Sequence, residues 1–148
     1  MGRGMARGER GGMEMDDSAM AMMREMMAPV MRVMAYEPQH LLAHKDSLQL
    51  TSDQVTKLTA IENAAKADHD AAANDMKTHM GALDQAFQTA SPDTSALRTH
   101  FEAAHAAMGK AHWAALSAAA QARAVLTDAQ RQKIDARISA MGEHARSY

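Results

Sequence analysis

Two histidines one helical turn apart are the first candidates for metal chemistry. His40 and His44 stand at positions i and i+4 of a segment that Pro38 can open as a short helix. Side chains at this spacing project from one face of a helix, so the two imidazoles can share a metal ion. The alternative interpretation is a pair of surface histidines with no ligand.

A second group of histidines and methionines is expected where two long helices face each other. The spacing places its members on the facing sides of both helices: His69, Met76, His79, His105, Met108 and His112. If the chain turns near Pro92, the register pairs Met76 with Met108, His79 with His105, and His69 with His112. A mixed imidazole and thioether cluster suits Cu(I), Ag(I) or Cu(II). The alternative, which is the better interpretation of any single residue, is methionine packing with histidines at the edge of the seam.

The third candidate is the methionine-rich start of the chain. Eleven of the 15 methionines lie between Met1 and Met34. Packing of a stripe through Met22, Met26, Pro29 and Val33 is the first interpretation. Thioether binding of Cu(I) or Ag(I) is the second, and adaptable binding of apolar client proteins is the third.

The sequence offers no motif of an enzyme. A glycine-rich phosphate loop, a Ser/His/Asp set and a paired-carboxylate site are all missing. The Glu-x-x-His pattern of di-iron bundles occurs once, at Glu102 and His105, whereas such a site needs it twice. The absence of cysteine excludes thiolate sites and disulfides. We therefore expect a protein that is not an enzyme.

Composition favours long, thin helices. Aromatic residues make up 3% of the chain, and alanine and methionine dominate its apolar residues. Alanine favours helices but buries little area, so thin seams are expected in place of a thick core. The net charge of −2 gives no basic surface for nucleic acid. Residues 20–36 are too short and too charged to span a bilayer, and no signal peptide is visible in residues 1–12.

Cap and turn signals divide the chain into a series of helices. The expected segments are a disordered Gly/Arg-rich tail over 1–16, a Met-rich helix over 17–36, and a helical domain over 37–148. Within that domain we expect a short helix over 38–44, long helices over 51–90 and 94–125, and a C-terminal helix from 127. The predicted fold is all-α, with the long helices forming an antiparallel hairpin. The apolar periodicity includes Phe87 on the first long helix and assigns Phe101 and Met108 to the inner seam of the second.

The same capping box begins two of these helices. Thr51 and Gln54 have the spacing of an N-cap and its N3 partner, and Thr127 and Gln130 repeat it. A leucine precedes each threonine, and the downstream segments LTSDQVTKLTA and LTDAQRQKIDA share their apolar register. A repeat that extends beyond the box indicates two related structural units.

Two Leu-Thr-x-x-Gln boxes in this order resemble the LTxxQ family, over about residues 37–145. Its members include the periplasmic chaperones Spy and CpxP, the zinc-linked ZraP, and CnrX-like metal sensors. The resemblance implies a curved helical hairpin that is usually dimeric, a periplasmic location, and a role in envelope or metal stress. Motifs this short identify a fold better than an activity.

The resemblance to CnrX-like sensors also implies a set of metal ligands. His40 and His44 match a His-x-x-x-His pair before the first box, and Glu62 matches a glutamate twelve residues after its leucine. The match fails at Ala118 and Ala122, where those sensors carry a histidine and a methionine. The three matching residues would hold zinc, nickel or a similar ion together with water. The alternative for Glu62 is an ion pair in the seam.

Two functions of different kinds follow. The first is a periplasmic protein that binds copper, silver, zinc or nickel as a sensor or buffer in heavy-metal resistance. The alternative is an ATP-independent holdase for unfolded proteins with no specific metal site. The expected partners are a second copy of the chain, together with unfolded clients or a membrane-bound signalling protein.

Overall fold

The computed structural model describes residues 17–144 and is all-α, with no strand in that range. Its six helices are α1 (Asp17–Ala35), α2 (Pro38–Ala43), α3 (Lys45–Leu48), α4 (Ser52–Phe87), α5 (Thr94–Val125) and α6 (Asp128–His144). The expected disorder of residues 1–16 lies outside the described residues. The sequence did not predict α3, which fills most of the expected loop before the first capping box.

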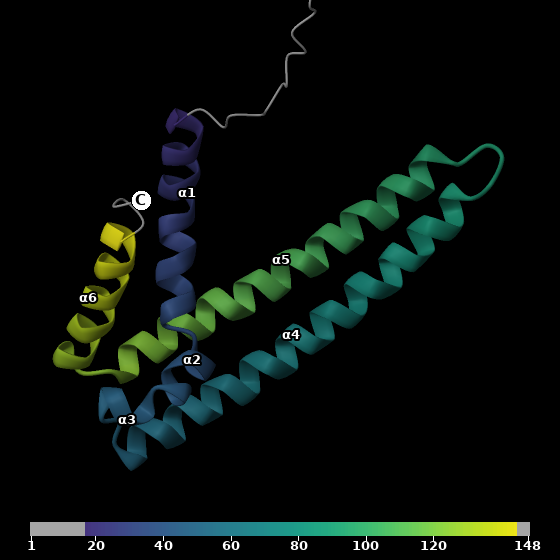
Figure 1. Ribbon diagram of the computed structural model, residues 1–148. Coiled ribbons are helices and arrows are strands. Elements are labelled where there is room, and N and C mark those ends of the chain that lie inside the picture. Colours follow the sequence, from purple (N-terminus) through teal and green to yellow (C-terminus); the bar gives the residue numbers. More distant parts are fainter. Residues whose placement is uncertain (1–16, 145–148) are drawn as a thin grey trace, which may run out of the picture.

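The long helices α4 and α5 form the predicted antiparallel hairpin. Figure 1 shows them side by side, with their connecting loop at one end and all the other helices at the opposite end. We call these the tip and the base of the hairpin. The loop comprises residues 88–93, so the turn near Pro92 is confirmed, although α4 ends at Phe87 and not near Ala90.

Both predicted capping boxes are present at the base. The Thr51 hydroxyl accepts a hydrogen bond from the backbone N–H of Gln54 (3.2 Å), and the Gln54 side-chain oxygen accepts one from the backbone N–H of Thr51 (3.0 Å). Thr127 and Gln130 repeat this exchange at 3.3 and 2.9 Å. Each box satisfies two N–H groups that the first turn of a helix leaves without partners.

The two boxes also bind each other through their glutamines. Gln54 and Gln130 are buried, and each side-chain amide donates to the oxygen of the other, at 2.8 and 3.0 Å. Each amide also donates to a backbone carbonyl at 3.2 Å, Gln54 to Val125 and Gln130 to Leu48. No buried side-chain nitrogen or oxygen of residues 17–144 lacks a hydrogen-bond partner. Burial of these two amides is therefore compensated, because every donor and acceptor has a partner.

The hydrophobic core surrounds this amide pair. Leu41 and Leu58 are fully buried, and they cluster with Tyr36, Leu48, Ala119, Ala122, Leu126 and Ile134. Full burial of a leucine side chain contributes about 1.5–3 kcal/mol. The members of this cluster come from α2, α3, α4, α5 and α6 and from the segments that connect them, so the base joins these helices in one core.

The seam between α4 and α5 is built from alanine. Its fully buried positions along the hairpin are Ala72, Ala104 and Ala107, followed by the alanines nearest the base. We expected Phe87, Phe101 and Met108 in this seam, and that prediction is wrong: they are 66%, 56% and 39% exposed. Small side chains let two helices approach closely, and this leaves no room between them for large ones. The large residues therefore lie on the outer surface.

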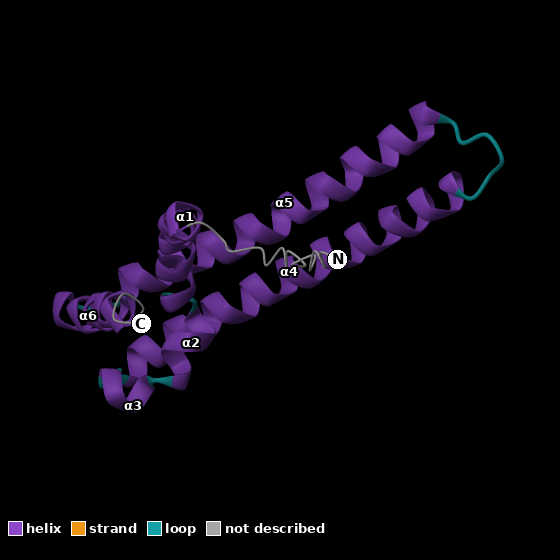
Figure 2. Cartoon of the chain, turned by 45° about the horizontal axis from the view of Figure 1, so that its top comes forward, coloured by secondary structure: helices purple, strands orange, loops and turns teal. Residues whose placement is uncertain are grey.

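Helix α1 packs on the hydrophobic core through its C-terminal end. Figure 1 shows it rising from the base beside α6, and Figure 2, in which α1 is foreshortened, shows it next to the base end of α5 and far from the connecting loop of the hairpin. Val33 and Ala35 pack against the core, and the buried Tyr36 donates its hydroxyl hydrogen to Asp135 of α6 at 2.6 Å. The guanidinium of Arg123 lies 4.5 Å from the centre of the Tyr36 ring. These contacts attach one end of α1 and leave its other turns uncovered.

Candidate functional site

The structure brings His40 and His44 together as predicted from their spacing. Their ring centres lie 4.5 Å apart at the base. His44 donates its Nδ1 hydrogen to the backbone carbonyl of His40 at 2.9 Å. This fixes the tautomer of His44 and leaves the lone pair on Nε2 available to a metal ion.

The electrostatic surroundings keep His40 neutral. Partial burial lowers the pKa of His40 below its usual value, and the neighbouring His44 and Arg137 lower it further, although Glu37 acts in the opposite direction. A neutral imidazole is the form that binds a metal. The lowered pKa therefore favours metal binding by His40, and the two neighbouring rings together supply two donors.

Glu62, the third predicted ligand, is half-buried on α4. Within residues 17–144, no group of three histidine, aspartate or glutamate side chains is arranged to hold a metal ion. Binding of an ion by His40, His44 and Glu62 stays a prediction. It requires side-chain movement or further donors from outside this set.

The two long helices pair in a different register from the expected one. The ring of His79 lies near that of His100, with centres 6.4 Å apart, whereas His105 stacks on Phe101 of its own helix at 5.6 Å. The expected pairing of His79 with His105 is therefore wrong. The loop runs from residue 88 to 93 and is centred before Pro92, and the position that faces His79 moves from His105 to His100, by more than one turn.

The same shift separates Met76 from Met108, whereas it leaves His69 level with Lys110, two residues from His112. By this register Met76 lies across from the region of Ala104 and not from Met108. The Nδ1 atom of His69 lies 3.8 Å from a carboxylate oxygen of its neighbour Asp70. The side chain of His69 is 58% exposed, and His112 is also exposed. A metal role for His69, Met76, His79, His105, Met108 or His112 stays a prediction without the facing geometry on which it was based.

An apolar groove lies at the tip of the hairpin. It has a volume of about 600 Å³ and is lined by Met80, Leu83, Asp84, Phe87, Leu97, Arg98 and Phe101. Phe87 and Phe101 are both more than half exposed there, and Met80 is 49% exposed. We call this the tip groove. One acidic and one basic side chain flank its apolar lining, so it suits a partner that is mostly apolar.

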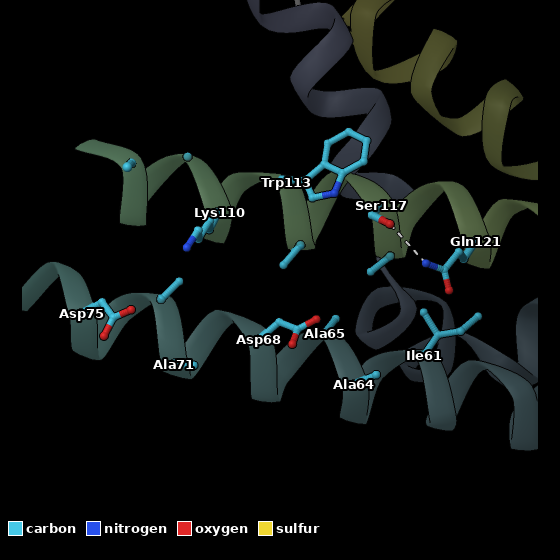
Figure 3. A pocket seen from close by; sticks show the side chains of 15 residues that line it. Ile61, Ala64, Ala65, Asp68, Ala71, Asp75, Lys110, Trp113, Ser117 and Gln121 are labelled. Atoms are coloured by element: carbon cyan, nitrogen blue, oxygen red, sulfur yellow. Dashed lines mark hydrogen bonds between the residues drawn. The ribbon is translucent and has the colours of Figure 1, made fainter. Parts of the chain in front are cut away.

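A second groove follows the middle of the hairpin. It measures about 680 Å³ and lies between α4 and α5, where Asp68, Asp75, Lys110, Trp113 and Gln121 are among its lining residues. Figure 3 shows the two aspartates on α4, with Lys110 and Trp113 on α5. We call this the middle groove. Trp113, the single tryptophan of the chain, is 66% exposed at its edge.

The two grooves open on opposite sides of the hairpin. At 100° per residue, Phe87 and Met80 of the tip groove point to one side of the seam of α4, and Asp68 and Asp75 of the middle groove point to the other. On α5, Phe101 flanks the seam, whereas Trp113 points away from α4, as Figure 3 shows. Apolar binding surface is therefore spread around the hairpin.

The methionines of α1 form a third uncovered surface. No residue of α1 is buried, and Met22 and Met26 are 64% and 71% exposed. The first interpretation of this helix, packing of Met22 and Met26 on the hairpin, is wrong, because only the last turn reaches the core. Among residues 17–144, no helix is long and apolar enough to cross a membrane.

Sequence reasoning missed three features of these sites. His100 was overlooked, although it stands nearly as far after the loop as His79 stands before it. The exposed pair Phe87 and Phe101 was assigned to the seam, because apolar periodicity does not show which of two neighbouring faces is buried. The third missed feature is the contact between Gln54 and Gln130. The repeated box was the available signal, because two related structural units can pack on each other.

The arrangement defines a class of all-α hairpin proteins in which two Leu-Thr-x-x-Gln boxes lock together at the base. The model of the LTXXQ motif family matches residues 37–138, which is more than half of the chain, and the chain belongs to this family. Proteins of the family are generally extracytoplasmic and are stress or metal-sensor proteins without enzymatic activity. Comparisons with curated proteins and with solved structures gave no significant match.

Proposed function

We propose that this chain is a periplasmic, Spy/CpxP-like holdase that binds apolar segments of unfolded proteins on its hairpin without ATP. The observation that carries the proposal is the exposure of Phe87, Phe101 and Trp113, at 66%, 56% and 66%. The chain has only two phenylalanines and one tryptophan, and none of them packs in the core. Large apolar side chains kept in water are typical of surfaces that bind other chains.

The distribution of these residues favours an extended client over a folded partner. The tip groove and the middle groove lie on opposite sides of the seam. A twofold interface between two copies uses one continuous patch on each copy, so it covers one side. An unfolded chain is flexible enough to contact both. Met80 adds an adaptable, polarizable contact that accepts apolar groups of different shapes.

Suppression of client aggregation tests the proposal. The full chain, at concentrations near that of a chemically unfolded client, should reduce light scattering, and EDTA should leave this effect unchanged. The variant Phe87→Gln/Phe101→Gln/Trp113→Gln should lose most of the suppression. Absence of suppression by the unmodified chain for several clients would overturn the proposal, as would full suppression by the triple variant.

A matched control replaces exposed methionines that lie outside the hairpin. Met22, Met26 and Met141 are 64%, 71% and 62% exposed, and all three lie outside the hairpin. The variant Met22→Gln/Met26→Gln/Met141→Gln should keep its suppression. Circular dichroism and thermal unfolding of both variants verify that each retains the helical fold. Equal losses in the two variants would show that general hydrophobicity, and not the hairpin surface, holds the client.

Metal binding at the base is the second candidate, because one specific observation favours it. The ring centres of His40 and His44 lie 4.5 Å apart, partial burial lowers the pKa of His40, and Nδ1 of His44 donates to the backbone carbonyl of His40. This candidate predicts that zinc, nickel or copper(II) raises the melting temperature, and that His40→Ala/His44→Ala removes the effect. Loss of the effect in Glu62→Gln as well would place Glu62 among the ligands. An unchanged melting temperature with all three ions would reject the candidate.

A further inference from the structure

The composition of α1 differs from that of every packed helix in the molecule. Its 19 residues include seven methionines and no leucine, isoleucine, aromatic residue, histidine or cysteine. The large aliphatic residues buried at the base are mostly leucine, namely Leu41, Leu48, Leu58 and Leu126. Leucine would serve equally well for apolar contact in α1, because it is similar in volume and in helix propensity. The feature that distinguishes methionine from leucine is its thioether sulfur.

Five of these methionines follow one face of α1. Met20, Met23, Met27, Met31 and Met34 succeed one another at steps of three, four, four and three residues. They are between 40% and 55% exposed. We call them the thioether stripe. Residues at these steps are neighbours on a helix, with Cβ atoms about 5–6 Å apart, so the sulfurs of their long, flexible side chains can meet on one ion.

From this geometry we propose that the thioether stripe binds Cu(I) or Ag(I). Thioethers are soft, neutral ligands and prefer soft monovalent ions, whereas zinc and nickel need imidazole, thiolate or carboxylate donors. At 100° per residue, Glu25 and Arg32 lie on the side of α1 opposite the stripe, whereas Arg24 lies at the edge of the stripe. The stripe extends over about four turns, or roughly 21 Å, and this length accommodates two ions with two or three sulfurs each.

The attachment of α1 gives the bound ion a structural effect. Only its last turn packs on the core, so the turns that carry Met20, Met23 and Met27 depend on the intrinsic stability of the helix. An ion held by sulfurs three or four residues apart connects successive turns. Amide hydrogen exchange over residues 20–31 should therefore slow when Ag(I) is added, while exchange in α6 should not change.

Titration of the full chain with Ag(I), or with Cu(I) in the presence of a competing chelator, tests the proposal. Replacing all five stripe residues, as Met20→Leu/Met23→Leu/Met27→Leu/Met31→Leu/Met34→Leu, should weaken binding at least about tenfold. This change keeps the helix and its apolar surface, so client binding should persist. The matched control Met76→Leu/Met80→Leu/Met108→Leu/Met141→Leu should bind as the unmodified chain does.

The pH dependence separates the stripe from histidine sites. Thioethers do not take up protons, so affinity for Ag(I) should be the same at pH 5.5 and pH 7.5. A loss smaller than tenfold in the stripe variant would overturn the proposal, as would an equal loss in the control. A strong fall in affinity at pH 5.5 would also overturn it, because the ion would then depend on His40, His44 or another imidazole. Failure of the holdase assay would leave this result unaffected, since the stripe lies outside the hairpin.

Discussion

The base and the outer parts of this molecule use their side chains in opposite ways. At the base, the amides of Gln54 and Gln130 are fully hydrogen-bonded, to each other and to nearby backbone groups, and Leu41 and Leu58 are inaccessible to water. At the tip of the hairpin and along α1, the largest apolar side chains are exposed. The base thus resembles the interior of a larger protein, whereas the hairpin arms and α1 resemble a binding surface.

This difference shows how a small helical chain can combine stability with exposed apolar surface. The seam of α4 and α5 needs only alanine, so the hairpin projects from the base without burying its large residues. Interactions that hold the fold are concentrated where the two capping boxes meet. Substitutions in the outer parts should therefore change binding, and substitutions in the base should change stability.

The largest effect on stability is expected for a leucine of the core. Leu58→Ala should lower the free energy of unfolding by about 3 kcal/mol, because it removes a fully buried side chain and leaves a cavity. Leu116→Ala, at a position that is 45% exposed on α5, should lower it by less than about 0.5 kcal/mol. Urea unfolding measures both. Similar losses would contradict the distinction between base and arms.

Substitution in the amide pair of Gln54 and Gln130 should have the next largest effect on the free energy of unfolding. Gln130→Ala removes the partner of Gln54 and leaves the backbone N–H of Thr127 without its acceptor. It should therefore lower the free energy of unfolding by about 2 kcal/mol. In a double-mutant cycle, Gln54→Ala/Gln130→Ala should destabilise less than the two single changes added together. Strict additivity would show that the glutamines stabilise their helices separately.

Tyr36, which attaches α1 to α6, should contribute less to the free energy of unfolding than the amide pair does. Tyr36→Phe removes the hydrogen bond to Asp135 and should lower the free energy of unfolding by about 1.5 kcal/mol. Burial, and then the hydrogen bond and charge of Asp135, raise the pKa of Tyr36 to about 12. Because the folded state favours the protonated phenol, stability should fall as the pH rises from about 10 to 12. Thermal unfolding across this range should show a smaller fall for Tyr36→Phe, and an identical fall would contradict the assignment.

The smallest effect on stability is expected for a substitution in the pair of His40 and His44. His40→Ala should change stability at neutral pH by less than about 0.5 kcal/mol, because the side chain is exposed and neutral. The lowered pKa means that protonation favours the unfolded chain, so stability should decline as the pH falls below about 6.5. Urea unfolding at pH 7.5 and pH 5 should show a weaker acid sensitivity in His40→Ala. A greater sensitivity would mean that protonated His40 is stabilised in the fold.

Much of this fold could be predicted from local signals. Thr51 and Thr127 begin helices because their side chains cap free N–H groups, and the segment around Pro92 cannot continue a helix. The register between the long helices could not be predicted as well. It depends on where α4 ends and on the course of the loop, and a change there replaces one facing pair by another, as His79 with His100 in place of His105 shows.

Side-chain exposure was the other limit of the sequence. Phe101 and Met108 have the periodicity of a buried seam, yet the neighbouring positions Ala104 and Ala107 occupy it. Periodicity identifies an apolar stripe but does not decide between close packing by alanine and wider packing by large residues. The pairing of His40 with His44 was predictable, because it depends only on the spacing within one turn.

The fluorescence of Trp113 tests the central claim most directly, because it is the single tryptophan and lies on the hairpin surface. A tryptophan-free client is unfolded and added to the full chain. If the hairpin holds clients, the emission of Trp113 shifts to shorter wavelength and saturates at the client concentration at which aggregation is suppressed. Suppression of aggregation with no change in that emission would contradict the account.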